Sequence, residues 1–199
     1  MRKTILFVIL DKYADWEAAY LSSALAMLCE DKYETKTVSL TKDPVHSIGG
    51  FSTQPDYDIE SAPEEYEALI LIGGMTWRSE EAQKVGPMAE RCFNSGRILG
   101  GICDASAFLG TLKILNNIKH TSNDLNDLQH WAKDAYSGES NYIMEQAVSD
   151  NNVITANGTA PLEFAREVLL TLKAAPEKKI TDWYNFHKLG FYNAPMPEM

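Results

Sequence analysis

The segment RILGGICDASAFLG (97–110) contains the pattern that decides the fold. Residues 98–102 form a continuous run without a charged side chain, which predicts a buried strand, and Ala105 begins a stretch with helical spacing. Cys103 lies between the two, with Gly101 two residues before it and Ala105 two residues after it. Small residues at these positions are typical of a sharp strand-to-helix elbow that exposes a nucleophile. The segment therefore predicts such an elbow with Cys103 at its tip.

Strands and helices alternate along the rest of the chain. Short apolar or alternating runs predict strands, and longer runs with apolar residues three and four apart predict helices. The predicted strands are 5–10, 35–40, 66–74, 97–102, 118–121 and 153–156, the predicted helices are 16–29, 79–93, 105–115 and 161–172, and 48–59 predicts a hairpin or loop. This order predicts right-handed strand–helix–strand units. The expected class is an α/β fold with a mostly parallel sheet and helices on both faces.

The length and charge limit the possible functions. The chain has 199 residues, a length that suits one domain, so 1–199 is treated as a single domain. Its 18 Lys and Arg against 28 Asp and Glu give a formal charge of −10. That charge repels phosphate backbones and anionic lipids, so neither nucleic acid nor a membrane is an expected partner. The longest apolar runs, such as 4–10 and 68–72, are much shorter than the ~20 residues of a membrane helix.

The N-terminus and the cysteines indicate a compartment. Residues 1–10 have a basic start, but charged residues end the apolar run and no small-residue cleavage site follows, which indicates a buried strand and not a signal peptide. Cys29, Cys92 and Cys103 show no C-x-x-C spacing. This argues against a disulfide framework and against a zinc site, and it favours a reducing cytoplasm.

Cys103 is the main candidate for chemistry. Sites in open parallel sheets form at the carboxyl ends of the strands, so the loops 11–17, 73–78 and 103–106 are expected to meet. The free N–H groups and dipole of a helix N-terminus favour the reactive thiolate. The alternative is a buried, inert cysteine, which is what we expect the other two cysteines to be.

Two further groups follow predicted strands. Glu17 comes after the first strand, and a carboxyl buried there could meet Cys103 with a raised pKa and move a proton; the alternative is an ordinary charge in a first helical turn. The pair 73–74 could offer a backbone N–H to an oxyanion beside that of Asp104, or it could be a plain turn. Asp104 itself opposes a thiolate unless its side chain points to solvent.

The histidines and aromatic residues give weaker indications. His120 and His130, like the other two histidines, suit surface or core positions better than that of a base. Residues 124–138 are polar and aromatic and could cover the carboxyl end of the sheet, and Trp77 could wall a pocket there. The tail 181–199 carries six large or ring-bearing side chains, which we expect to pack on the body or on a partner subunit.

Six segments together resemble the ThiJ/PfpI family of the class I glutamine amidotransferase-like superfamily, over nearly the whole chain. They are DWE (15–17), KDPVHSIGGFSTQPDYDI (42–59), ALILIGG (68–74), GGICDASAFLG (100–110), KHTSN (119–123) and VITANGTAPLEFAREVL (153–169). They resemble, in order, the family's acidic loop, hairpin, Gly-Gly strand end, cysteine elbow, strand before the lid, and closing strand, loop and helix. The resemblance implies a flavodoxin-like three-layer α/β/α sandwich. It also implies a homodimer, sometimes a hexamer, that needs no organic cofactor.

The resemblance also implies roles for particular residues. Cys103 matches the nucleophile, Glu17 the protonated glutamate that contacts it, and Gly74 and Asp104 the two backbone oxyanion donors. The chain departs from the family at two histidine positions. Asp104 stands where the protease-like branch has a histidine, and Asn123 stands where the deglycase-like branch has one.

Asn123 could orient a substrate or donate a hydrogen bond to a thiolate, but it could not accept a proton. His120 lies three residues earlier, on the opposite side of a strand, and is a poor substitute.

Three functions remain open from the sequence. The first is a cysteine-dependent hydrolase or lyase, peptidase-like or glyoxalase-like, in which Cys103 attacks small carbonyl compounds or amide bonds and Glu17 relays a proton. The second is a redox or stress sensor that works through oxidation of Cys103 and needs no general base. The third is a non-catalytic dimeric binding module that merely retains the cysteine.

Overall fold

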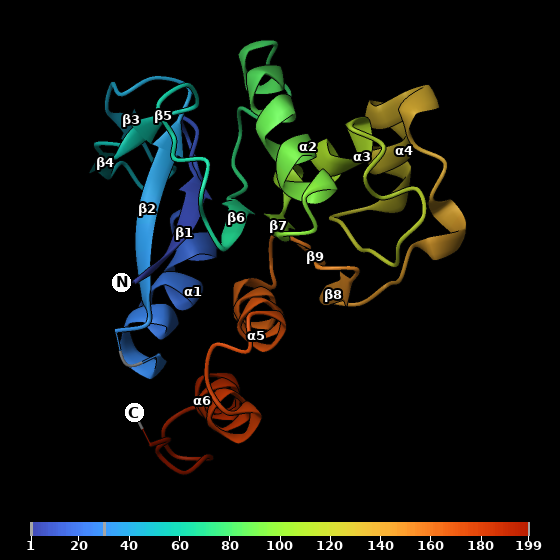
Figure 1. The fold of residues 1–199 in the computed structure, drawn as a ribbon. Helices are drawn as coiled ribbons and strands as arrows, with labels where there is room; N and C mark the ends of the chain where they lie inside the picture. The colour runs from blue at the N-terminus through green and yellow to red at the C-terminus, as the bar shows by residue number, and fades with distance from the viewer. Residues whose placement is uncertain (1, 30, 199) are drawn as a thin grey trace.

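The strands form a single main sheet and a separate small hairpin in the computed structural model, which describes residues 2–29 and 31–198 (Figure 1). The main sheet contains β1 (Lys3–Val8), β2 (Tyr33–Ser39), β5 (Tyr57–Asp58), β6 (Ala68–Leu71), β7 (Ile98–Ile102), β8 (Ala147–Asp150) and β9 (Val153–Ala156). Their order across the sheet is β5-β2-β1-β6-β7-β9-β8. All neighbours pair in parallel except β8 and β9, which are antiparallel. The hairpin consists of β3 (Val45–His46) and β4 (Ser52–Thr53), as predicted.

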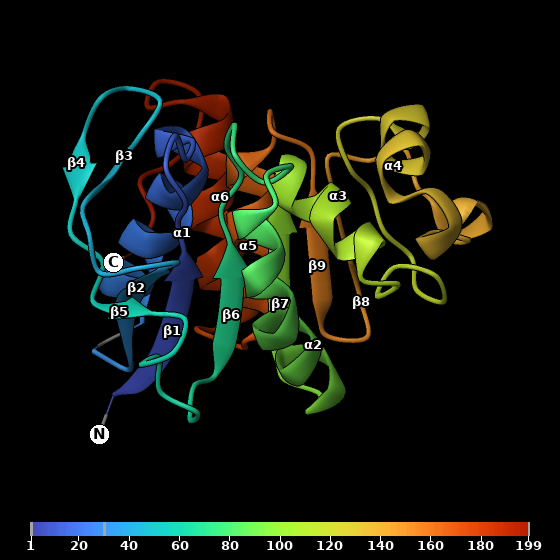
Figure 2. The ribbon, with the colours of Figure 1, turned by 90° about the horizontal axis from the view of Figure 1, so that it is seen from above.

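Helices cover both faces of the sheet (Figure 2). On one face lie α1 (Asp15–Leu28) and α5 (Pro161–Thr171), with α6 (Glu177–Leu189) packed on the outer side of α5. The other face carries α2 (Gly86–Asn94) and α3 (Asp104–Thr111), and α4 (Leu125–Ala132) packs beside α3. The predicted three-layer α/β/α sandwich with a mostly parallel sheet is therefore confirmed.

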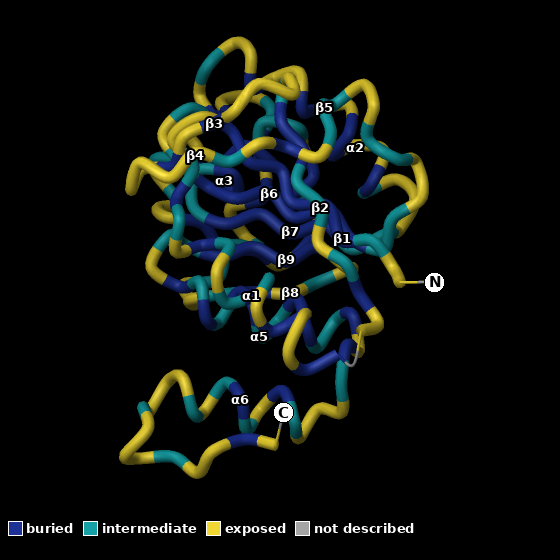
Figure 3. Tube along the Cα trace, turned by 90° about the vertical axis from the view of Figure 1, so that its left-hand side faces the viewer, coloured by how far each residue is buried: buried dark blue, intermediate teal, exposed yellow. Residues whose placement is uncertain are grey.

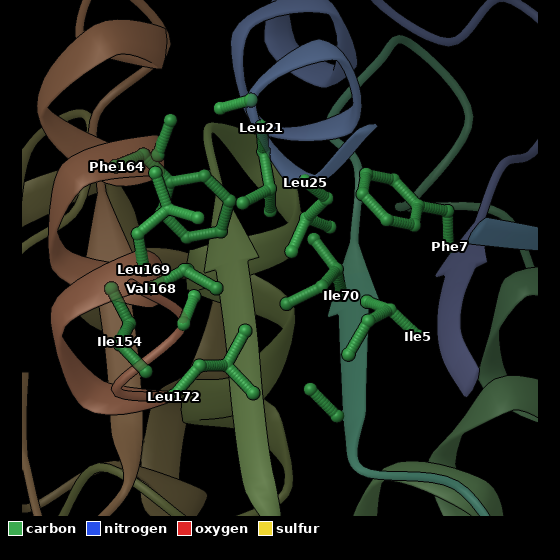
Figure 4. Close-up of a cluster of buried hydrophobic side chains, with 14 of the residues drawn as sticks. Ile5, Phe7, Leu21, Leu25, Ile70, Ile154, Phe164, Val168, Leu169 and Leu172 are labelled. Atoms are coloured by element: carbon green, nitrogen blue, oxygen red, sulfur yellow. The ribbon is translucent and has the colours of Figure 1, made fainter. Parts of the chain in front are cut away.

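The alternation of side chains along the strands divides the core in two. Ile5 and Phe7 of β1 pack under α1 and α5, whereas Leu6 and Val8 belong to the cluster under α2 and α3. Because both faces of a central parallel strand are covered, its sequence is apolar throughout and not alternating. In the first cluster, Phe164 of α5 meets side chains from α1 and from the strands (Figure 4).

Three predicted elements differ in the structure. The helix expected over 79–93 is split into a 3-10 helix, Glu81–Val85, and α2, because Pro87 occupies the first turn of a new helix. The strand expected over 118–121 was wrong: His120 forms only an isolated bridge with Tyr142. The segment 124–138, expected only as a cover, contains the helix α4, whose first turn is capped by Asp124.

The tail 181–199 is only partly buried. Its first half belongs to α6, where Trp183 is 3% exposed and packs edge-on to Tyr20 of α1. Phe191 and Tyr192, which follow α6, are 64% and 96% exposed. Figure 3 shows the segment between α6 and the C-terminus as mostly exposed. The expected packing of the tail on the body of the protein is therefore present for α6 but not for the segment after it.

The carboxyl ends of the central strands bring the three predicted loops together. The Ala14 amide donates to the Gly73 carbonyl at 3.0 Å, which joins the loops after β1 and β6. The Cys103 amide donates to the Ala156 carbonyl at 3.0 Å, which joins the loops after β7 and β9. Within residues 2–29 and 31–198, none of the helices has the length and apolar character needed to cross a membrane.

Candidate active site at the cysteine elbow

Cys103 occupies the predicted elbow between β7 and α3. Its backbone has φ 59° and ψ −134°, a positive φ that is costly for any residue other than glycine. The surrounding bonds hold it there, since its amide is bound by Ala156 and its carbonyl accepts from the Ser106 amide at 3.0 Å. Such strain is typical of functional turns. The predicted strained elbow is present in the structure, and its cysteine is partly exposed whereas Cys29 and Cys92 are buried.

Two glycines make room for the thiol. A Cβ atom on Gly73 would lie 2.5 Å from the Cys103 Cβ and 2.4 Å from an oxygen of Glu17. A Cβ atom on Gly158 would lie 2.9 Å from the Cys103 sulfur. All three distances are too short for any larger residue, so the backbones of these glycines form two walls of the site.

Glu17 lies against the elbow from the first turn of α1. Its side chain is fully buried, and its Oε2 accepts a hydrogen bond from the Gly73 amide at 2.8 Å. Its Oε1 is buried and, among the described residues, has no hydrogen-bond partner of ordinary geometry. That oxygen and the Cys103 sulfur face the same point beside Gly158, within 3.3 Å and 2.9 Å of the position a Cβ would take there. The predicted meeting of Glu17 with Cys103 is therefore present in the structure.

Burial changes the acidity of both groups. Loss of solvent raises the pKa of Glu17 to about 7, and hydrogen bonds with Cys103 and Gly73 offset only part of this effect. Burial also raises the pKa of Cys103 to about 11, and the negative charge of Glu17 adds to the rise. Desolvation and the neighbouring carboxylate therefore act against the thiolate that the helix N-terminus was expected to favour. The two titrations are linked, because a negative charge on Glu17 opposes loss of the thiol proton.

Asn123 takes the position at which related proteins were expected to have histidine. Its side-chain Nδ2 donates to the Cys103 sulfur at 3.4 Å, and its Oδ1 accepts from the Gly158 amide at 2.8 Å. The bond from Asn123 lowers the pKa of Cys103, although burial has the larger and opposite effect. The amide therefore supports a thiolate but cannot serve as a base.

Asp104, directly after the nucleophile, is held by a cation. Its carboxylate receives two bonds from Arg78, at 3.0 and 3.1 Å, and the same guanidinium binds Asp127 of α4 at 3.1 and 2.6 Å. Arg78 also lies over the ring of Trp131, 4.9 Å from its centre. The Arg78 guanidinium, forked between Asp104 and Asp127, therefore connects the elbow to α4. It also partly neutralises the charge of Asp104 next to the thiol.

Two other sequence candidates lie away from the sulfur. Trp77 is fully buried, donates to the Ile72 carbonyl at 2.7 Å and packs on Phe108, so the expectation that it walls an open pocket is wrong. His120 is also fully buried, with its ring nitrogens 2.8 Å from the Ile118 carbonyl and 2.7 Å from the Tyr136 hydroxyl. Burial lowers the pKa of His120, which keeps it a neutral core residue.

His130 lies on α4 and is exposed.

Of the two backbone donors named from the sequence, the amide of Asp104 lies at the thiol. The Asp104 amide points at the Cys103 thiol and helps to lower its pKa, against the larger effect of burial. Gly74 packs against the backbone of Lys12 and Tyr13, where a Cβ would lie 2.5 Å from a carbonyl oxygen. Their role as oxyanion donors stays a prediction.

Arg78 and Gly158 were not singled out from the sequence, and the Gly73 amide was considered there only as a possible oxyanion donor, whereas the structure pairs it with Glu17. The Asn-Gly pair at 157–158 follows the last parallel strand, and its place at the carboxyl end of β9 is the signal that could have indicated it. Arg78 had no such signal, because its partners are distant in sequence. Among residues 2–29 and 31–198, no three His, Cys, Asp or Glu side chains are grouped to hold a metal ion.

A pocket of about 560 Å³ adjoins the elbow. Its walls come from the segments 121–126 and 142–146 and from Asn157. Asn123 belongs both to this wall and to the surroundings of the Cys103 sulfur. A molecule in the pocket would therefore contact Asn123, whose side chain also reaches the thiol.

These features define a flavodoxin-like α/β protein built around a cysteine elbow. The pattern of the DJ-1/PfpI family matches residues 3–171, and the chain belongs to that family. The chain is 38% identical over 192 residues to the "Uncharacterized protease YdeA" of Bacillus subtilis (strain 168), covering 96% of this chain and 94% of that protein.

Two solved structures are similar throughout. A thiJ/pfpI family protein from Bacillus anthracis has 32% identity and a TM-score of 0.88, covering 94% of this chain and 91% of that one. The DJ-1 superfamily protein Atu0886 from Agrobacterium tumefaciens has 33% identity and a TM-score of 0.82, covering 93% and 99%. The resemblance expected from the six sequence segments is confirmed.

Proposed function

We propose that this protein is a cysteine-dependent hydrolase or lyase that acts on small electrophilic carbonyl compounds or amide bonds. The observation that carries the proposal is the carboxyl of Glu17, fully buried with its Oε1 facing the same point beside Gly158 as the Cys103 sulfur. A pKa of about 7 allows this carboxyl to give or take a proton near neutral pH. The word "protease" in the name of the Bacillus subtilis relative agrees with a hydrolytic reaction.

The first step joins the thiol and the carbonyl group. The Cys103 sulfur bonds to the carbonyl carbon, the π electrons move to the oxygen, and the thiol proton passes to the Glu17 carboxylate. The amides of Gly74 and Asp104 would donate to the new oxyanion. Asn123 holds the sulfur in place but takes no proton, so Glu17 is the one acid–base group assigned to the reaction.

The second step depends on the substrate. With an ester or amide, the carbon–heteroatom bond breaks, the leaving group takes the proton from Glu17, and water then hydrolyses the thioester to restore the thiol. With an aldehyde, the proton passes from Glu17 to the oxygen and gives a hemithioacetal. Because a single carboxyl must serve every transfer, activated carbonyl compounds should react faster than peptide bonds.

Turnover by the purified protein tests the proposal. The substrates are methylglyoxal, a glycated thiol, an activated ester and a short peptide amide. We expect turnover of at least one of them that Cys103→Ala abolishes, while Cys92→Ala, which removes a buried thiol, retains it. Turnover that survives Cys103→Ala, or no turnover of any of these substrates, would contradict it.

A second candidate function is oxidation sensing at Cys103. It is favoured by the exposure of this cysteine, since the other two are buried. A carboxyl proton on Glu17 could donate to a sulfinate formed there. Intact-mass measurement after mild peroxide should show oxygen added at Cys103 first, and random oxidation of the three cysteines would exclude the sensor.

We also propose that the chain forms homodimers in a reducing compartment. Trp16 at the start of α1 and Ile48 and Phe51 of the hairpin are 48%, 41% and 69% exposed. They are neighbours, because the Gly49 amide donates to the Asp15 carboxylate at 2.8 Å. Sedimentation analysis should give twice the chain mass, and Phe51→Asp should shift it toward the monomer; a monomeric wild-type protein would exclude the dimer.

A further inference from the structure

The pocket beside the elbow is negatively charged. Its lining contains two carboxylates, Asp124 and Glu145, and no Lys, Arg or His. The remaining polar groups include the amides of Asn123 and Asn157, which carry no charge. An anionic ligand would meet two like charges there and no counter-charge, whereas a cation would be attracted.

Local hydrogen bonds leave the two carboxylates available to a ligand. Asp124 uses Oδ1 to accept from the Asp127 amide at 2.9 Å, which caps α4 and fixes the side chain at the pocket wall. Glu145 is exposed, and its contact with Thr121 is made by its backbone carbonyl, which accepts at 3.0 Å. Its carboxylate is therefore not needed to hold the wall.

The rest of the wall also suits a cation. Tyr142 lines the pocket, and its hydroxyl donates to the Ser122 carbonyl at 3.1 Å, which holds its ring in the wall. Aromatic rings attract ammonium and guanidinium groups. The nearby guanidinium of Arg78 is bound between Asp104 and Asp127, so it does not offset the charge of the pocket.

We infer that this pocket binds a cationic organic group of the substrate, an ammonium or a guanidinium, while the reacting carbonyl faces Cys103. The part of this inference that concerns a reacting substrate rests on the proposed function. The preference of the pocket for cationic over anionic groups does not, and it can be measured without turnover. Asn123 links the two parts, since it lines the pocket and lies 3.4 Å from the sulfur. Substrates with a carboxylate or phosphate in the corresponding place should be rejected.

Thiol labelling tests the charge selection directly. Two methanethiosulfonates of similar size are used, one with a trimethylammonium group and one with a sulfonate, and each transfers its alkylthio group to the thiolate with loss of methanesulfinate. Their rates at Cys103 are measured by intact mass and divided by their rates with a small free thiol. Because both reagents react with the same thiolate, the ratio does not depend on the pKa of Cys103.

We expect the cationic reagent to react about tenfold faster at low salt and the preference to shrink at high salt, as for a local electrostatic field. Glu145→Gln and Asp124→Asn should each reduce the ratio at least twofold; asparagine still caps a helix, so α4 is retained. Glu64→Gln removes the same charge from a residue at the opposite end of the sheet, before β6, and should leave the ratio unchanged. A ratio near one, or an equal fall in Glu64→Gln, would overturn the inference.

A pair of matched activated esters separates this inference from the proposed function. The two esters carry a trimethylammonium or a sulfonate group at the same position. If Cys103→Ala abolishes turnover but both esters react equally, the inference fails and the proposed function stands. If the labelling preference is present and neither these esters nor any of the four substrates named under the proposed function turns over, the proposed function fails and the charge selection stands.

Discussion

The Asn123 side-chain amide donates to the Cys103 sulfur at 3.4 Å. Its orientation is set from the other end, because its oxygen accepts from the Gly158 amide at 2.8 Å and so turns the N–H toward the sulfur. The sulfur is thus held by a donor that stays neutral at every pH. In the proposed reaction, proton transfer beside the thiol is therefore assigned to Glu17.

Asn123→Asp should slow the reaction of Cys103 with iodoacetamide. The variant keeps the size of the side chain but replaces a donor with a negative charge, which disfavours the thiolate. One unit of thiol pKa corresponds to about a tenfold lower rate below that pKa. Asn123→Ala removes only the donor and should have a smaller effect. Alkylation followed by mass spectrometry at one pH measures both, and a faster Asn123→Asp reaction would contradict the assigned hydrogen bond.

Glu17→Gln should remove a pH dependence of stability. The pKa of Glu17 rises from 4.5 in the unfolded chain to about 7 in the folded protein. Between these values the folded state binds the extra proton, so stability is highest below the lower value and falls as pH rises to the upper one. The loss is at most about 3 kcal/mol. Urea unfolding from pH 4 to 8 should show this decline in the wild type and not in Glu17→Gln; parallel curves would show that Glu17 is not protonated in the folded state.

The same substitution should affect alkylation and turnover in opposite directions. The charge of Glu17, together with the larger effect of burial, raises the pKa of Cys103. Glu17→Gln removes that charge and should speed alkylation above pH 8, by about an order of magnitude for one unit of pKa. Turnover should fall by at least ~100-fold, because the proton acceptor is lost. Both rates are measured on one preparation, and a parallel rise or fall would contradict the two roles of this carboxyl.

Arg78→Ala should weaken the attachment of α4 and lower the alkylation rate of Cys103. The fork to Asp104 and Asp127 is partly exposed, so its loss should destabilise the protein by only about 1 kcal/mol. The unpaired charge of Asp104 then disfavours the thiolate of Cys103, and alkylation should fall about threefold. The double variant Arg78→Ala, Asp104→Asn should restore the rate. Alkylation kinetics and urea unfolding separate the two effects, and no rescue by the second substitution would mean that Arg78 acts by packing alone.

Much of the fold could be predicted from local patterns. The apolar runs 98–102 and 153–156 became β7 and β9, since a strand covered on both faces must be apolar throughout. The elbow was likewise predictable, because small residues around Cys103 satisfy a local steric requirement. One wrong prediction also had a local cause, because Pro87 in the first turn of α2 divides the helix expected over 79–93. The segment 118–121 has strand-like residues but makes only one isolated bridge.

The sequence by itself determined the α/β class, the cysteine elbow and the acidic residue after the first strand, because each depends on neighbours a few positions apart. Only the tertiary structure decided that Asn123 and Gly158 hold the sulfur, that Arg78 joins Asp104 to α4, and that Cys103 is a weaker acid than its helix alone would make it. These contacts join loops that meet only when the parallel strands align. The pKa depends on how much solvent the assembled loops exclude, and no local spacing in the chain encodes that quantity.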